Sequence, residues 1–168
     1  MSAVGRHRLP FDPVEEAAKQ WDTQWGEMHR MRAVTSLMRV HQLLLTELDE
    51  LLRPLGLTFA RYEVLVLLSF SRRGALPLGK IGERLQVHAT SVTPLVKRLE
   101  AADLIRRTPH PEDGRAVLAS ITSKGRLVME KATDAIVGAR FGLSALSDEE
   151  CDQLTWLLTM PREAAGDF

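Results

Sequence analysis

The sequence contains a single cysteine, Cys151, and few aromatic residues, which make up 5% of its 168 positions. One cysteine excludes an internal disulfide framework and any zinc site built from several cysteines, which fits a reducing compartment. No apolar run approaches the roughly 20 residues that a membrane-spanning helix needs, and the charged residues 1–8 lead into no hydrophobic segment. We therefore expect a cytoplasmic protein that makes no contact with a membrane.

The sequence also lacks net charge, because 22 basic residues balance 22 acidic ones. This balance argues against an indiscriminate nucleic-acid binder. The distribution is nevertheless uneven: nine basic residues accompany five acidic ones from Arg72 to Ala116, whereas three accompany eight from Glu130 to Phe168. We expect the basic middle segment to meet phosphate groups and the acidic end to lie elsewhere.

Motifs typical of enzymes are missing as well. Gly-x-Gly-x-x-Gly, Gly-x-Ser-x-Gly and His-Glu-x-x-His are all absent, and no nucleophile is paired with a base. The five histidines show no metal-ligand spacing on a common helix face. His41 lies on an apolar helix stripe, which favours a place in the core or in a dimer interface. The sequence therefore predicts no catalysis, no metal and no cofactor.

Amphipathic helices account for most of the chain. A capping Asp12 followed by a first-turn Pro13 predicts a short helix that ends near Trp25. Apolar residues at helical spacing from Val34 to Leu55 predict a long second helix. Because this stripe is longer than a small lobe can bury, we expect part of it to face a partner subunit.

Three further helices follow from caps and apolar periodicity. Thr58 is expected to cap a core helix over residues 59–72, and a long helix is expected over residues 122–142. The sequence Ser147-Asp-Glu-Glu150 is a capping box that opens the last helix. Cys151 lies in the first turn of that helix, where packing against Leu146 is favoured over a thiol switch.

Two short helices, residues 78–85 and 89–103, are predicted to form a helix-turn-helix. The small Gly82 lies where the helices cross, and Ile81 and Val92 point inward. Outward positions carry short hydroxyls and a lysine, which suit base edges and phosphates in a DNA major groove. These candidates are Thr90, Ser91, Thr93, Pro94 and Lys97. The alternative is an ordinary solvated helix pair.

A β-hairpin is predicted directly after this pair, with strands at residues 105–108 and 117–121. The dipeptide Asp113-Gly114 is a strong turn signal, and Asp113 can accept a hydrogen bond that stiffens the loop. Arg115 is then near the tip, where a planar guanidinium suits the negative potential of a minor groove. The alternative is a surface Arg–Asp pair that contributes at most about 1 kcal/mol.

Several short motifs resemble, in order, those of the MarR family of winged-helix bacterial transcriptional regulators. They are Val92-Thr93, Arg98-Leu99-Glu100, Leu104-Ile105-Arg106-Arg107, Asp113-Gly114-Arg115 and Ile121-Thr122-Ser123-Lys124-Gly125. The resemblance covers about Ala33 to Leu158. It implies a mainly α fold with a small β-hairpin wing, that is, a winged helix-turn-helix with a helical dimerisation lobe. It also implies a homodimer that reads a near-palindromic duplex, with Arg98 and Arg107 among its DNA-binding residues.

On this basis residues 1–168 are one domain. Residues 11–56 and 122–165 are expected to form the dimerisation lobe, and residues 57–121 the DNA-binding lobe. The expected function is a homodimeric, sequence-specific regulator, a repressor that a small ligand releases from DNA. The alternative is a helical module that docks another protein, for which a basic hairpin tip would be unnecessary.

Pro94 departs from the family pattern. Inside the recognition helix it removes the amide that would bond to the Thr90 carbonyl, which bends the helix or costs about 3 kcal/mol. We expect this change to alter the preferred DNA sequence more than the fold. His88 stands where the family often has a capping serine, so the start of the helix needs another support.

The extra N-terminal helix resembles a subgroup of the family that senses urate-like purines, which are small anionic aromatic effectors. The residues that correspond are Trp21 or Trp25, Glu63 and Arg98. An anion near Glu63 would compete for Arg98 and move the recognition helix. The alternative is that Glu63 and Arg98 form a structural ion pair while the tryptophans only pack.

Overall fold

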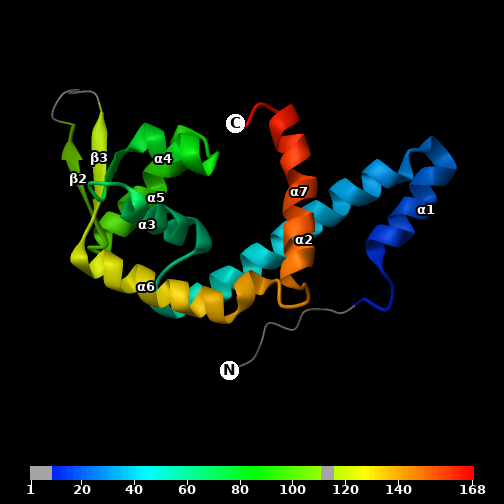
Figure 1. Cartoon of the computed structure of the whole chain (residues 1–168), viewed down its shortest axis with the longest axis horizontal. Helices are drawn as coiled ribbons and strands as arrows, with labels where there is room; N and C mark the ends of the chain where they lie inside the picture. The colour runs from blue at the N-terminus through cyan, green and yellow to red at the C-terminus, as the bar shows by residue number, and fades with distance from the viewer. Residues whose placement is uncertain (1–8, 111–115) are drawn as a thin grey trace. The chain divides into compact units, whose positions relative to one another are not determined.

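The computed structural model describes residues 9–110 and 116–168, without the side chains of residues 89 and 90 (Figure 1). The chain divides into two compact units, Met1–Thr46 and Glu47–Phe168. The long helix α2 (Met28–Leu52) begins in the first unit and ends in the second. In the described part of the chain, every helix is too short or too polar to span a membrane.

The first unit contains α1 (Pro13–Trp25) and most of α2. The expected cap of α1 is confirmed, because Asp12 Oδ1 accepts the backbone N–H of Val14 at 2.8 Å. Gly26, at φ +67°, ends α1. An ion pair of 2.7 Å then joins Glu15 of α1 to Arg32 of α2. The predicted N-terminal helix therefore exists and is attached to the helix that follows it.

The second unit holds the winged helix and the C-terminal helices (Figure 1). Its further elements, in chain order, are η1 (Arg53–Leu55), α3 (Phe59–Phe70), β1 (Ala75–Pro77), α4 (Leu78–Leu85), α5 (Ala89–Ala101), β2 (Ile105–Pro109), β3 (Val117–Ile121), α6 (Ser123–Gly138), η2 (Arg140–Gly142) and α7 (Asp148–Ala164).

The core of this unit forms around α3, whose run of apolar residues is buried as the sequence predicts. Thr58 caps the helix by accepting the backbone N–H of Arg61. Side chains from every neighbouring element join this core and are less than 2% exposed. They include Leu52, Leu57, Val64, Leu65, Leu68, Ile81, Val92, Val96, Leu99 and Ile136. The hydrophobic effect of burying them holds helices α4 and α5 on α3.

The sheet has three antiparallel strands in the order β1-β3-β2. The hairpin of β2 and β3 is confirmed, with Ile105 opposite Ile121 and Pro109 opposite Val117. The sequence did not predict β1, which pairs Ala75 with Ser120 on the other edge of β3. Three residues are too few to show an alternating pattern of apolar and polar side chains. By pairing with β3, the segment between α3 and α4 connects the hairpin to the core.

Three predicted helix ends are wrong by a few residues, and backbone conformation explains two of them. The predicted helix 122–142 ends at Gly138, because Arg140, Phe141 and Gly142 all have positive φ and cannot continue it. The second helix of the pair ends at Ala101, shortly before Asp103 takes φ +59°. The core helix, predicted to reach residue 72, stops at Phe70.

Candidate nucleic-acid interface

The helix-turn-helix depends on a close approach at Gly82, as the sequence predicts. A Cβ at this position would lie 3.1 Å from the Val87 carbonyl oxygen and 3.3 Å from Cγ2 of Val92. The Val87 N–H donates to the Gly82 carbonyl at 3.1 Å, and Gln86 adopts φ +52° to make the turn. The angle between α4 and α5 is therefore set by contacts that leave little room for a side chain.

Replacing Gly82 with alanine is expected to lower the free energy of unfolding by about 1 to 2 kcal/mol, because the backbone of the turn must move. The matched control is Gly79→Ala in the same helix, where an added Cβ meets nothing within 4 Å. That control should raise stability by about 0.5 kcal/mol through helix propensity. Urea unfolding of both variants tests this, and equal effects would contradict the close approach.

The outward face of α5 carries the residues that the sequence proposed for reading DNA. Ser91, Thr93, Pro94 and Lys97 are exposed, whereas Val92 and Val96 are buried. Arg98 is exposed too. Leu95 is half-buried and packs against the core, and Val96 is fully buried in it. The side chain of Thr90 lies outside the described residues.

Pro94 lies inside α5 without ending it, because the helix runs from Ala89 to Ala101. Its exposed ring leaves the carbonyl of Thr90 without the amide partner that a helix normally supplies. The recognition helix therefore presents the proline ring on its exposed side.

Arg107, a predicted DNA contact, binds inside the lobe. Its Nε donates to Glu100 Oε2 at 2.6 Å, and its backbone N–H donates to Glu100 Oε1 at 3.3 Å. The side-chain hydrogen bond from Arg107 is the main cause that lowers the pKa of Glu100 below its ordinary value. This pair, which we call the Glu100–Arg107 brace, joins the recognition helix α5 to strand β2. Arg107 therefore positions the hairpin.

The tip of the hairpin, residues 111–115, lies outside the described residues, and with it Asp113 and Arg115. The strands are described up to its edges, where the His110 N–H donates to the Ala116 carbonyl at 3.0 Å. The hairpin thus continues beyond β2 and β3 towards the tip. The roles of Asp113 and Arg115 stay predictions.

The residues predicted to bind an effector lie in both units. In the first, Trp21 and Trp25 pack together with ring centroids 4.7 Å apart, and both are exposed. In the second, Glu63 is half-buried and Arg98 is exposed. No ion pair joins Glu63 to Arg98 in the described part of the chain, so the expected structural pair is not formed. Burial alone raises the pKa of Glu63.

Replacing Glu63 with glutamine is expected to raise the melting temperature at neutral pH. The pKa of Glu63 is higher in the folded than in the unfolded chain, so the ionised carboxylate destabilises the fold above the folded pKa. Protonation removes this penalty as the pH falls through the folded pKa, and the advantage of Glu63→Gln should vanish below the ordinary value of 4.5. Calorimetry across this range measures the effect. The matched control is Glu130→Gln at an exposed position.

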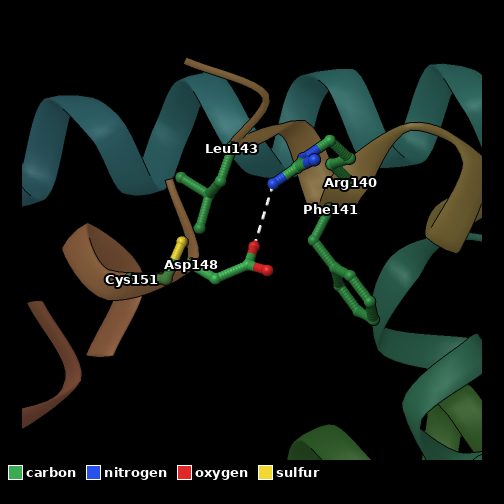
Figure 2. A pocket seen from close by; sticks show the side chains of 5 residues that line it. All are labelled: Arg140, Phe141, Leu143, Asp148 and Cys151. Carbon is green, nitrogen blue, oxygen red and sulfur yellow. Dashed lines mark hydrogen bonds and ion pairs between the residues drawn. The ribbon is translucent and has the colours of Figure 1, made fainter. Parts of the chain in front are cut away.

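A surface cavity of about 360 Å³ lies where η2 meets α7 (Figure 2). Arg140 and Asp148 form an ion pair of 3.0 Å at this cavity, and Phe141, Leu143 and Cys151 complete its lining. Cys151 is half-buried there, and its packing against Leu146 stays a prediction. The capping box of α7 is confirmed by reciprocal hydrogen bonds between Ser147 and Glu150. Among residues 9–110 and 116–168, no cluster of His, Cys, Asp and Glu could hold a metal ion.

Two crossed helices followed by an antiparallel hairpin define this lobe as a winged helix-turn-helix, the architecture of a DNA-binding regulator. The chain belongs to the MarR family of transcriptional regulators, so it is not an enzyme. The MarR family model matches residues 57–117. The organic hydroperoxide resistance transcriptional regulator of Bacillus subtilis is 41% identical over 104 residues, which are 62% of this chain and 69% of that protein.

Solved structures agree with this assignment. Sco5413, a MarR family transcriptional regulator from Streptomyces coelicolor, is 52% identical with a TM-score of 0.78, over 83% of this chain and 96% of that one. A mutant of MarR from E. coli, solved with operator DNA, is 25% identical with a TM-score of 0.67, over 75% of this chain and 90% of that one. The mainly helical winged fold predicted from the sequence is thereby confirmed.

Proposed function

We propose that the chain is a homodimeric, sequence-specific DNA-binding repressor that a small ligand releases from its operator. The observation that carries this proposal is the two-sided character of α5. Its inner residues Val92, Val96 and Leu99 are buried, while its outer residues are polar or charged and exposed. Such a helix is held rigidly and offers hydrogen-bonding groups to the edges of bases.

Two cations strengthen this reading of α5. Lys97 and Arg98 are exposed, and no carboxylate within the described residues pairs with either. Unpaired cations beside short polar side chains such as Thr93 can bind phosphates and position the helix in a major groove. The homologous MarR of E. coli was solved with operator DNA, which supports the same use here. We place the protein in the cytoplasm, where it can meet such DNA.

Arg115 supplies the test of the DNA contact. Selection from a random duplex pool should yield a near-palindrome of roughly 16 to 20 base pairs, with half-sites about one helical turn apart. On that duplex, Arg115→Ala should weaken binding by about 1 to 3 kcal/mol without changing the melting temperature. The exposed control Arg53→Ala should bind as the wild type does.

Unchanged affinity of Arg115→Ala at moderate salt would remove the hairpin tip from the interface. If no duplex were retained even at low ionic strength, the alternative function would stand instead, a winged-helix module that docks a protein. Of these two functions, the unpaired cations of α5 favour DNA binding over protein docking.

Dimerisation is supported by apolar side chains that the single chain leaves exposed. On α2 within the first unit, Val34, Leu37 and Met38 are 56%, 45% and 58% exposed, and they share one helix face. On α7, Trp156 is 64% exposed. Faces of this kind are stable in water when a second subunit covers them. We propose residues 11–56 and 122–165 of the single domain 1–168 as the dimerisation lobe, and residues 57–121 as the DNA-binding lobe.

For the ligand, we propose a small anionic aromatic molecule that binds Arg98 in the second unit, while the contributions of Trp21, Trp25 and Glu63 stay predictions. Arg98 has no carboxylate partner in the described structure. An anion that binds Arg98 would therefore bind directly to the recognition helix. Urate and related aromatic acids should displace the protein from its selected duplex in a fluorescence titration. Absence of displacement at millimolar concentrations would discard this effector class.

A further inference from the structure

An aromatic side chain projects from the winged-helix lobe at the end of α3. Phe70 is 82% exposed, more than any other large apolar residue in the described part of the chain. The preceding residues Leu65 and Leu68 are fully buried, and the hydroxyl of Ser71 donates to the Leu68 carbonyl at 2.9 Å, which fixes the end of the helix. Phe70 is thus presented by a rigid element, outside the α2 and α7 faces proposed for dimerisation.

Three arginines lie on the loop that follows this phenylalanine or reach that loop from α6. Arg72 and Arg73 follow it after Ser71 and are exposed. Arg126 of α6 reaches the same loop, because its Nη2 lies 2.6 Å from where a Cβ on Gly74 would be. None of these three guanidinium groups has an ion pair or side-chain hydrogen bond with a described residue, even with Glu130 one turn from Arg126. We call Phe70, Arg72, Arg73 and Arg126 the Phe70 patch.

The Phe70 patch lies at the base of the hairpin. The Gly74 carbonyl accepts the N–H of Ile121 at 2.9 Å, at the end of β3 where α6 begins. Val117, which pairs with Pro109, is at the opposite end of β3 (Figure 1). A partner on the patch would therefore lie at the end of the hairpin away from Val117, and Arg115, the predicted DNA contact, precedes Val117 in the chain.

We propose that the Phe70 patch is a docking site for an acidic protein segment that carries a large apolar side chain. The unpaired guanidinium groups would bind carboxylates of this segment, in the bidentate geometry that arginine favours. Its apolar side chain would cover Phe70 and remove that ring from water. A phosphate backbone supplies the negative charge without such an apolar group, so the exposed ring favours a protein partner over a nucleic acid.

A pair of fluorescent peptides tests the proposal on the full chain. The first is a short Asp- and Glu-rich peptide with a central Leu-Trp, and the second has alanines in place of Leu-Trp. The first should raise the fluorescence anisotropy with wild-type protein and bind about tenfold more tightly than the second. Phe70→Ser and Arg72→Glu should each weaken its binding about tenfold. Both changes are at exposed positions, so melting temperatures should stay the same.

Matched controls are Phe11→Ser, another exposed phenylalanine, and Arg53→Glu, another exposed arginine, and both should bind the first peptide as the wild type does. Equal binding of the two peptides, or full binding by Phe70→Ser, would overturn the proposal. The proposal would also be overturned if a single-stranded oligonucleotide bound the wild type more tightly than the first peptide and Phe70→Ser abolished that binding. Loss of self-association by Phe70→Ser, measured by sedimentation, would overturn it as well. Because no DNA is present, the result is independent of the proposed operator binding.

Discussion

Replacing Gly125 with alanine is expected to lower the free energy of unfolding by about 3 kcal/mol or more, the upper end for overpacking. A Cβ at Gly125 would lie 2.0 Å from the carbonyl oxygen of Leu104. No rotamer change relieves such a contact, because both atoms belong to the backbone framework of α6 and of the segment that enters β2. Urea unfolding followed by circular dichroism measures the loss.

The surrounding hydrogen bonds make this contact rigid. Thr122 caps α6 by accepting the N–H of Gly125 at 2.9 Å, while its own N–H donates to the Leu104 carbonyl at 3.0 Å. Moving α6 away from Leu104 would break the second bond, and moving the strand would disturb the sheet. The variant can therefore relieve the clash only by losing hydrogen bonds at the base of the hairpin.

Gly138→Ala in the same helix is the matched control. An added Cβ there meets nothing within 4 Å, so the variant should be more stable than the wild type by about 0.5 to 1 kcal/mol. If Gly125→Ala proved as stable as Gly138→Ala, the close packing of α6 on Leu104 would be disproved.

Leu37→Glu is expected to convert the protein into monomers and to reduce operator affinity about 100-fold or more. Leu37 lies in the exposed apolar face of α2, and a charge there would have to be buried in the proposed dimer. A monomer engages one half-site and loses the effective concentration that links two reading lobes. Sedimentation should then give the 18.8 kDa of a single chain.

Ser36→Glu introduces the same charge on the opposite side of α2, at an exposed position, and should leave the dimer intact. A monomeric wild-type protein, or a Leu37→Glu variant that stays dimeric and binds DNA normally, would each refute the assignment of this face.

The α2 stripe shows how far the sequence predicts the fold. Its helical period predicts one long helix and one apolar face, and both are confirmed. The period does not reveal that Leu48 and Leu52 enter the core of the winged-helix unit at 4% and 0% exposure, while Leu37 stays exposed at 45%. That division depends on which residues far along the chain pack against each turn of the helix.

The interface was predictable where local chemistry determines it. The crossing at Gly82 follows from a small residue between two short amphipathic helices, so the sequence predicts it. The brace between Glu100 and Arg107 joins a helix to a strand, so neither the helical nor the strand period applies across the seven residues that separate them. The partner of Arg107 therefore becomes visible only when β2 lies beside α5, and its contact with DNA stays a prediction.

Gly125 and strand β1 were beyond sequence reasoning for a related reason. Gly125 belongs to a family motif, but its need for a missing side chain comes from Leu104, which is distant in sequence. The three residues of β1 acquire their strand conformation by pairing with residues 118–120 on a later strand. Both features depend on partners that no short window of sequence contains.

The Glu100–Arg107 brace has a consequence for which DNA sites such a protein can use. Because this pair fastens α5 to the hairpin, the DNA contacts proposed for the helix and for the hairpin would lie a fixed number of base pairs apart. The loss of affinity caused by a base change should differ between the part of the site under the helix and the part under the hairpin. A single base pair inserted between them should remove one of the two contacts altogether.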